Sequence, residues 1–393
     1  MASPEPVFIS PLLGADGAWS GYHVEFAPGE FDGKTLEQLY EAPLLDEFDH
    51  RAPWFVPVTE EANYENRLGD RVIPVFPATP PTRERESLKA LEAHLRLATR
   101  PVALAAAPDQ KLPGTGCWNY LLIASSHARS LPPFTLLGLS SRTKLVCTEV
   151  HTHNDREWGV ANACDLSTGE FLQTRSPANT KADITRIKLL KLLALIVDDA
   201  DTEALDAIFR EEQKLSYSLL RLVNSAALSP RTPISSFSQA INLLGRRQLQ
   251  RWLQLLVYSD PNDGQHPNPL LQKAASRGRL LELLAPHLAD ASTAEHCTGD
   301  ITFMIGTFSL LDVLLNVAMP SILSQLPLPA IAQRALAEHG GALGELLDAI
   351  AAADRRELKV ASSRLKALGI DAKTYLDAQL EAFSWASKIH PPG

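Results

Sequence analysis

Hydrophobic and polar positions change their spacing near the middle of the chain. Up to about residue 177, short apolar runs such as "VFIS", "WFVPV", "RVIPVF" and "KLVCTEV" are separated by turns with proline or glycine, which is typical of buried strands. The stretch "RERESLKALEAHLRLA" has the apolar spacing of a helix. Strands that alternate with helices indicate an α/β layer or barrel. We therefore predict an α/β domain over residues 1–177.

From residue 184 onward the pattern is helical. Stretches such as "ITRIKLLKLLALIV", "DTEALDAIFREEQKLSYSLLRLV" and "DAKTYLDAQLEAFSWASK" repeat apolar residues at the spacing of a helix face. Ser235 or Ser236 can cap one of these helices. We predict an all-α domain over residues 184–393, joined to the first domain by a linker at residues 178–183.

The composition is that of an ordinary globular protein. The chain has 393 residues, enough for two or three domains, and 45% of them are hydrophobic. The formal net charge of −9 argues against a general affinity for nucleic-acid polymers, because their phosphates would be repelled. The four cysteines form no Cys-x-x-Cys pair, which fits a reducing compartment. The start "MASPEPVFIS" lacks the features of a secretory signal, so we expect a cytoplasmic protein.

One apolar stretch, residues 301–323, is long enough to be considered as a membrane span. Asp312 stands at its middle and Pro320 near its end. A charge at the centre of a bilayer is costly. We therefore expect a buried helix of a helical bundle, and no membrane as a partner.

The stretch "LLRLVNSAALSPRTPISSFSQAINLLGRRQLQRWL" predicts a helix, a proline-bounded turn and a second helix. Asn224 stands near the end of the first helix, where its side chain can bind neighbouring backbone. Gly245 is expected to let two helices approach closely. Arg247 and Arg251 lie one turn apart and can bind a phosphate or an acidic partner, although a solvated helix face is the alternative.

This stretch resembles the signature of the HDOD domain, the HD-related output domain of bacterial signalling proteins. The later stretch "ITFMIGTFSLLDVLLNVAMPSILSQLPLP" resembles a second motif of the same family. The resemblance implies a compact helical bundle related to HD-type metal phosphohydrolases. Such hydrolases need neighbouring His and Asp ligands, but the chain contains no His-Asp dipeptide. Metal hydrolysis is therefore not expected in this half.

The first half resembles the EAL domain of EAL–HDOD fusion proteins, a barrel that hydrolyses cyclic di-GMP with two divalent metals. The stretches "VFISPLLGADGAWSGYHVEFAP", "KLVCTEVHT" and "CDLSTGEFLQTRSP" carry the resemblance. Only Glu149 and Gln173 remain of the family's functional residues, so the resemblance implies a reduced, degenerate barrel with no catalytic residue and no cofactor. The motif glutamate falls on His23, and the other lost positions fall on Pro57, Pro74 or Val75, Ala105, Ala106, Leu122 and Ala124.

The segment "HTHND" is the most metal-like local cluster in the chain. If the segment is extended, His151, His153 and Asp155 share one face and are weak candidates for metal ligands. The alternative is a solvated polar surface where a strand passes into a loop.

The preferred function from the sequence is that of a non-catalytic bacterial signal-transduction protein. It acts through a protein partner, with an interface expected around Asn224 and Arg247 of the HDOD helices. Two alternatives stay open. The chain can be a receptor that binds cyclic di-GMP, or a residual cyclic di-GMP phosphodiesterase that depends on Glu149.

Overall fold

The computed structural model describes residues 4–58, 66–108, 110–175, 194–195, 213–225, 230, 233–258, 267–288 and 299–389. The chain divides into two compact units. The barrel unit consists of Met1–Thr174, Asp354–Lys359 and Tyr375–Asp377, and the helical unit consists of the remaining segments. The predicted linker at residues 178–183 lies outside the described residues.

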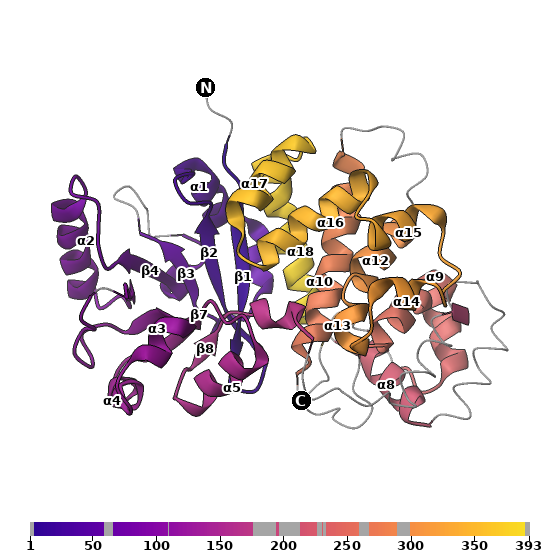
Figure 1. The fold of residues 1–393 in the computed structure, drawn as a ribbon, viewed down its shortest axis with the longest axis horizontal. Helices are drawn as coiled ribbons and strands as arrows, with labels where there is room; N and C mark the ends of the chain where they lie inside the picture. The colour runs from indigo at the N-terminus through magenta and orange to yellow at the C-terminus, as the bar shows by residue number, and fades with distance from the viewer. Residues whose placement is uncertain are drawn as a thin grey trace. The chain divides into compact units, whose positions relative to one another are not determined.

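The barrel unit is a closed barrel of eight strands in sequence order (Figure 1). β1 is antiparallel to its neighbours β2 and β8, and the other neighbouring strands are parallel. This confirms the predicted α/β barrel. The strands are β1 (Val7–Gly14), β2 (Trp19–Phe26), β3 (Trp54–Pro57), β4 (Val72–Pro77), β5 (Ala103–Ala105), β6 (Tyr120–Ala124), β7 (Lys144–Thr148) and β8 (Leu166–Ser167).

The apolar runs form strands that are buried on both faces, as short hydrophobic runs in parallel sheets usually are. On β7, Val146 points to the barrel interior, whereas Leu145 and Cys147 pack outward against helices. The interior cluster consists of Leu12, Phe55, Ile73, Ala103, Leu122, Val146 and Leu166. These seven side chains fix which face of each strand points inward.

Five helices of the barrel unit are described, and they alternate only in part with the strands. The predicted helix "RERESLKALEAHLRLA" is confirmed as α2. Between β5 and β6 the described residues form no helix. The helices are α1 (Gly33–Glu41), α2 (Arg85–Leu97), α3 (Ser125–Ser130), α4 (Thr135–Ser140) and α5 (His153–Ala161), with 3-10 turns η1 (Pro43–Glu47), η2 (Gly69–Arg71) and η3 (Glu170–Gln173).

The described part of the helical unit is all-α, as predicted, and contains no strand. Its helices are α8 (Gln213–Val223), α9 (Phe237–Leu256), α10 (Pro269–Leu284), α12 (Gly299–Phe308), α13 (Leu311–Leu315), α14 (Met319–Leu323), α15 (Ala330–Ala337), α16 (Gly341–Asp354), α17 (Leu358–Ala367) and α18 (Ala372–Ser387), with the 3-10 turn η4 (Ala285–His287). Ser236 caps α9, because its side chain accepts a hydrogen bond from the Gln239 amide.

The single buried helix expected over residues 301–323 is wrong. The segment forms the three helices α12, α13 and α14, because Asn316 ends α13 in the left-handed conformation and Pro320 begins α14. The burial of α12 is as expected, since every residue from Thr302 to Phe308 is buried. Among the described residues, none of the helices combines the length and apolar character that a membrane span requires.

The expectation that Gly245 lets two helices approach closely is wrong. Gly245 interrupts α9 with a φ of +73°, and a Cβ added there would have no neighbour within 4 Å. Glycine is needed at this position for the conformation of a kink. Close packing occurs between α10 and α12, where a Cβ on Gly306 would lie 2.5 Å from the carbonyl oxygen of Arg277. A Cβ on Gly278 would lie 2.5 Å from Thr307 Oγ1.

Candidate functional site

The carboxyl ends of β2 to β8 meet at one end of the barrel, which we call the barrel mouth. Enzymes with parallel α/β barrels place their reacting groups at this end. Side chains alternate along a strand, so the residue two positions after an interior residue also points inward. From the interior cluster, this rule places six residues in the inward layer at the mouth: Pro57, Val75, Ala105, Ala124, Thr148 and Thr168.

None of these six side chains carries a carboxylate. A pair of divalent metals is normally held by several oxygen ligands, mostly carboxylates. Pro57, Val75, Ala105 and Ala124 offer no side-chain ligand atom. Within the described residues, no three His, Cys, Asp or Glu side chains are grouped closely enough to hold a metal ion. The mouth therefore does not fit the two-metal centre that the EAL resemblance implies.

The charged groups of the mouth form a different arrangement, which we call the mouth ion cluster: His23, Glu25, Glu170 and Arg356. Arg356 Nη2 donates to Glu25 Oε1 at 2.5 Å, and Arg356 Nη1 lies 3.6 Å from Glu170 Oε1. His23 Nδ1 lies 3.3 Å from Glu25 Oε2. The exposed fraction of each of these side chains is below one fifth. A guanidinium therefore stands between two carboxylates inside the barrel unit.

β2 and its partner β1 position the first two residues of the cluster. His23 and Glu25 share the inward face of β2, and they pair with Ser10 and Phe8 of β1. The intervening Tyr22 points to the other face, where it stacks on Trp54 with ring centroids 4.5 Å apart. Burial of that aromatic face fixes the register of β2, because a slip by one residue would exchange the two faces.

Glu170 and Arg356 come from turns. Glu170 begins η3 just after β8, and its Oε2 accepts a hydrogen bond from the Val150 amide at 3.2 Å. Arg356 lies between α16 and α17 with a φ of +60°, an uncommon conformation for a residue with a side chain. Its neighbours Arg355 and Glu357 form an exposed two-bond ion pair across the turn.

The cluster shifts the pKa of its members in the directions that burial and opposite charges dictate. Burial lowers the pKa of His23, and the charge of Arg356 adds to this, although Glu25 acts against both. Burial alone would raise the pKa of Glu25, but the charges of His23 and Arg356 lower it overall. Burial alone would lower the pKa of Arg356, but the carboxylates of Glu25, Glu170 and Glu149 raise it overall. At neutral pH the cluster thus holds ionised Glu25 and Arg356 beside a neutral His23.

The two residues predicted as remnants of an EAL site are differently placed. Glu149 follows β7 at the mouth, is exposed, has a φ of +56° and acts electrostatically on Arg356. Gln173 lies in η3, five residues beyond the inward-facing Thr168. A role for either residue in binding stays a prediction. Sequence reasoning did not predict the pair His23–Glu25 or the role of Glu170. The signal for the pair was the presence of two polar residues on the same face of β2.

Residues 151–155 do not have the extended conformation on which the weak metal candidacy of His151, His153 and Asp155 was based, because α5 begins at His153. Thr152 caps α5, and Asp155 completes a capping box by accepting from the amide and hydroxyl of Thr152. Asp155 also pairs with Arg129 at 3.0 Å. His153 Nε2 lies 3.1 Å from the Thr174 carbonyl oxygen, and His151 is exposed. The polar residues of this segment build a helix end.

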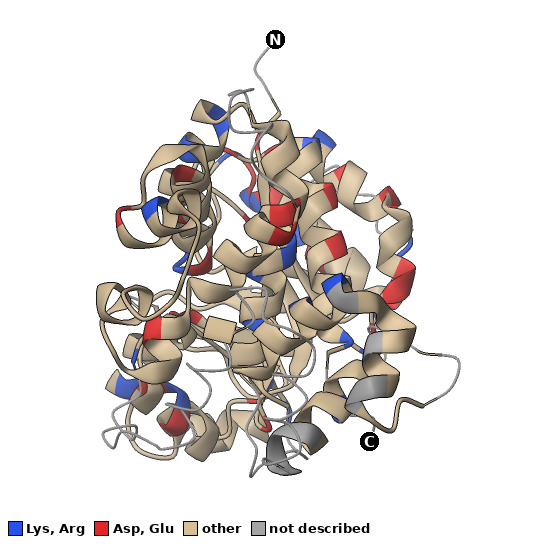
Figure 2. Cartoon of the chain, turned by 90° about the vertical axis from the view of Figure 1, so that its right-hand side faces the viewer, with Lys and Arg blue, Asp and Glu red and all other residues tan. Residues whose placement is uncertain are grey.

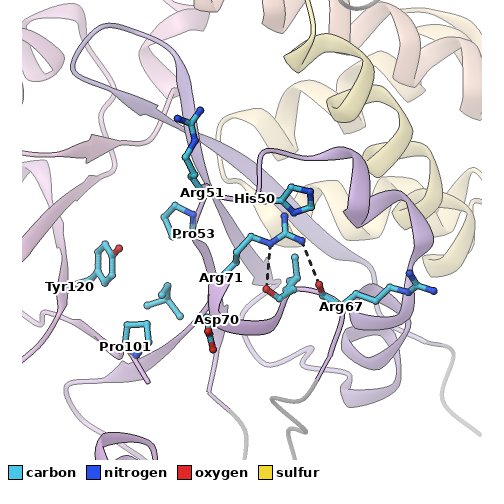
Figure 3. Close-up of a pocket in the computed structure, with 10 residues that line it drawn as sticks. His50, Arg51, Pro53, Arg67, Asp70, Arg71, Pro101 and Tyr120 are labelled. Atoms are coloured by element: carbon cyan, nitrogen blue, oxygen red, sulfur yellow. Dashed lines mark hydrogen bonds between the residues drawn. The ribbon is translucent and has the colours of Figure 1, made fainter. Parts of the chain in front are cut away.

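A hollow lies at the end of the barrel opposite the mouth, before the strands β3 to β6 (Figure 3). It encloses about 420 Å³ and is lined by several cations. These cations already have partners. Arg71 donates to the carbonyl oxygens of Leu68, Arg67, Leu45 and Asp49, and Arg51 binds Asp49 through two bonds. Groups at this end of a barrel commonly serve stability, and these contacts fit that role.

In the helical unit, Asn224 ties the end of α8 to the start of the next segment. Its amide donates to the carbonyl oxygens of Leu220 at 2.6 Å and Ile234 at 2.8 Å, and its oxygen accepts from the Ile234 amide at 2.7 Å. All of these bonds are internal. Asn224 therefore has a structural role, and the prediction that it binds a ligand gains no support from its contacts.

Arg247 and Arg251 differ sharply in their surroundings. Arg251 contacts Glu282 at 2.5 Å and Asp300 at 2.9 Å, and only 20% of its side chain is exposed. Arg247 lies 3.2 Å from Asp300 but is 82% exposed. Acidic and basic residues are interspersed over the helices in Figure 2, rather than separated into a basic face. Of the two arginines, only Arg247 keeps a surface that a partner can reach.

Residues 187–298 match the model of the HDOD domain family. This confirms the predicted HDOD domain over those residues, within the longer range expected from the sequence. Because the match covers less than half of the chain, it identifies this segment and not the whole protein.

Two curated proteins are similar to part of the chain. "Cyclic di-GMP phosphodiesterase CdgJ" of Vibrio cholerae serotype O1 is 30% identical over 192 residues, which are 49% of this chain and 43% of that protein. "Uncharacterized protein YuxH" of Bacillus subtilis is 28% identical over 179 residues, which are 44% of this chain and 41% of that protein. The similarity thus spans less than half the length of either relative.

Among solved structures, the crystal structure of the EAL-like domain protein YdiV is similar at a TM-score of 0.31 and 13% identity. The similarity covers 42% of this chain and 90% of that chain. A TM-score of this size supports no argument about this protein.

Proposed function

We propose that this protein is a non-catalytic signalling protein that acts by binding a partner protein. The observation that carries the proposal is the make-up of the barrel mouth. Its inward layer on β3 to β6 consists of Pro57, Val75, Ala105 and Ala124, and its two buried carboxylates are paired with Arg356. A hydrolase of cyclic dinucleotides needs bound metal to activate water and to bear phosphate charge. The side chains at this mouth supply hydrocarbon and an internal cation instead.

A turnover assay tests the absence of catalysis directly. The full-length chain is incubated with cyclic di-GMP and Mg²⁺ or Mn²⁺, and linear product is measured by chromatography. We expect no product above that of a sample without protein. Metal-dependent turnover that disappears on Glu149→Gln would overturn the proposal.

The second candidate function is that of a cyclic di-GMP phosphodiesterase. One observation favours it: a relative that is 30% identical over 192 residues bears that name. The same turnover assay decides between the two functions, and calorimetry with cyclic di-GMP tests a receptor that binds without cleaving. Binding without turnover would support the receptor and would leave the non-catalytic part of the proposal in place.

The partner surface that we propose lies on α8 and α9. Tyr217 of α8 is 62% exposed, and α9 exposes 55% of Leu243 together with the charge of Arg247, so these two helices present apolar side chains and a cation. Such a combination suits a partner with an apolar contact area and an acidic group. It replaces the interface expected around Asn224, whose hydrogen bonds are internal.

A pull-down with purified variants tests this surface. Leu243→Ser combined with Arg247→Ala should reduce the recovery of partners that bind the wild-type protein. Lys373→Ala on the exposed side of α18 is the matched control and should leave recovery unchanged. Equal recovery with the double variant and the wild type would remove α8 and α9 from the proposed interface.

A further inference from the structure

The barrel mouth has an unusual balance of charge. Glu25, Glu149 and Glu170 act on one guanidinium, that of Arg356, and His23 is held neutral by its burial. With Arg356 in place the carboxylates are partly neutralised. Without it, the buried carboxylates of Glu25 and Glu170 would lose their counter-charge, and an anionic ligand such as a cyclic dinucleotide would be repelled. The mouth is thus built for a cation.

The contacts select a guanidinium among cations. Arg356 uses its two terminal nitrogens for two different carboxylates, Nη2 for Glu25 and Nη1 for Glu170. A planar fork spans two acceptors in this way, whereas an ammonium is a compact point charge. Glu170 itself is 4% exposed and is oriented by the Val150 amide, so the acceptor is in place before the cation binds.

The cluster also has unused hydrogen-bonding capacity. His23 is 7% exposed, and its Nδ1 makes no hydrogen bond that meets normal geometry. Glu170 Oε1 and Arg356 Nη1 face each other at 3.6 Å, beyond hydrogen-bond distance, and neither atom has a hydrogen-bond partner among the described residues. Arg356 is therefore held at Glu25 by a close bond and at Glu170 by a looser one. A ligand guanidinium that is free of the backbone can improve on that geometry.

We propose that the barrel mouth is a guanidinium-binding pocket formed by Glu25 and Glu170, and that Arg356 is its intramolecular ligand. The chemical class that it takes is the alkylguanidinium group, as in an arginine side chain. This inference deepens the proposed function and rests on its view that the mouth holds no metal. It does not depend on the partner surface of α8 and α9.

Chemical rescue tests the pocket. Arg356→Ala removes the guanidinium and leaves a cavity, and it should lower Tm by roughly 5 °C or more, because two buried carboxylates lose their counter-charge. n-Propylguanidine at millimolar concentration should then raise Tm toward the wild-type value in a saturable manner. n-Propylamine at the same concentration should raise it less, since it lacks the planar fork.

Two controls sharpen the test. Arg355→Ala removes the neighbouring arginine, which is exposed and pairs only across its own turn, so neither its Tm nor its response to n-propylguanidine should differ from the wild type. Glu25→Gln in the Arg356→Ala background removes the closer acceptor and should abolish rescue. If Arg356→Ala does not fold alone, refolding in the presence of n-propylguanidine, followed by circular dichroism, is the corresponding readout.

The proposal is overturned if n-propylguanidine and n-propylamine act alike, or if rescue survives the loss of Glu25. Refolding of Arg356→Ala that is independent of n-propylguanidine, with an unchanged Tm, would also overturn it. Metal-dependent turnover by the wild type would refute the proposed function, and it is measured separately from rescue. The failures of the two proposals can therefore be told apart.

Discussion

Arg247 and Arg251 lie one turn apart on α9, yet their removal should have very different effects on stability. Arg251 makes four contacts with carboxylates at 2.5 to 3.3 Å, two to Glu282 and two to Asp300. Its guanidinium also lies 5.1 Å from the centre of the Phe303 ring. Arg247 makes one contact with Asp300 from a side chain that is 82% exposed. We predict that Arg251→Ala is strongly destabilising and Arg247→Ala almost neutral.

The magnitudes follow from exposure. Loss of one partner of a buried ion pair costs about 3–5 kcal/mol, because the other charge is left buried and unpaired. Glu282 is 13% exposed but keeps Arg279 at 2.7 Å, and Asp300 is 33% exposed, so both retain some compensation. We therefore expect Arg251→Ala to lower the free energy of unfolding by about 2–3 kcal/mol. An exposed ion pair contributes about 0–1 kcal/mol, so Arg247→Ala should stay near the lower end of that range.

Hydrogen exchange measured by mass spectrometry under mild urea separates the helical unit from the barrel unit peptide by peptide. Arg251→Ala should weaken protection in peptides from α9, α10 and α12, whereas peptides from β6 and β7 should keep their protection. Arg251→Met retains the apolar stem and removes the charge, so it distinguishes lost packing from lost charge. Full protection in Arg251→Met would mean that packing, and not the ion network, holds these helices. Equal losses for Arg247→Ala and Arg251→Ala would refute the argument from exposure.

Three further predictions use single changes. Gly306→Ala should destabilise by about 3 kcal/mol or more in urea unfolding, because its Cβ meets backbone at 2.5 Å, whereas Ala at the uncrowded position 245 should cost about 1–2 kcal/mol for its positive φ. Asn224→Ala removes three internal hydrogen bonds and should cost about 2–3 kcal/mol, seen as faster exchange in peptides from residues 213–225. Burial lowers the pKa of folded His23, so the unfolded chain binds the extra proton as pH falls below the usual value of 6.5, and stability falls with it. His23→Asn should flatten the stability profile just below pH 6.5, and an unchanged slope there would show that other groups cause it.

The spacing of polar and apolar residues was sufficient to predict an α/β layer or barrel and a helical half. The resemblance to the EAL domain supplied the choice of a barrel and the residues expected at its site. Pro57, Ala105 and Ala124 follow interior residues by two positions, so the period of a strand places them on the inward face once the structure identifies those interior residues. Local reasoning also predicted α2 and a cap at Ser235 or Ser236, and the structure shows that Ser236 is the cap. A residue's role can be predicted from the local sequence where that role depends only on the helix or strand that contains the residue.

Two local sequence signals, at residues 152–155 and at Gly245, were interpreted as features other than those the structure shows. Thr152 and Asp155 have the spacing of a capping box, which explains the polar cluster as the start of α5. Gly245 gave no indication of whether its role was close packing or a positive φ. Only the φ of +73° and the empty surroundings decide between the two.

The mouth ion cluster could not be predicted from local pattern, because Arg356 and Glu25 are 331 residues apart in the sequence. Arg356 stands in a short polar turn whose neighbours Arg355 and Glu357 look alike in the sequence, and nothing local distinguishes the buried arginine from the exposed one. The same difficulty applies to Arg247 and Arg251, which differ only in what α10 and α12 bring to them. Tertiary contacts decide the role of each arginine.

Arg356 bears on the choice between a phosphodiesterase and a non-catalytic signalling protein. A metal-dependent phosphodiesterase needs its carboxylates free to bind cations that are exchanged or shared with phosphate. In this chain Glu25 and Glu170 already face Arg356, and Arg356 has a raised pKa and stays charged. A divalent ion at the mouth would have to displace a covalently attached guanidinium, whose effective concentration is high because it is part of the same chain. Under the proposed non-catalytic function, turnover is opposed at this mouth in two independent ways, by the missing ligands on β3 to β6 and by the resident guanidinium. Changing only one of the two should therefore not produce turnover.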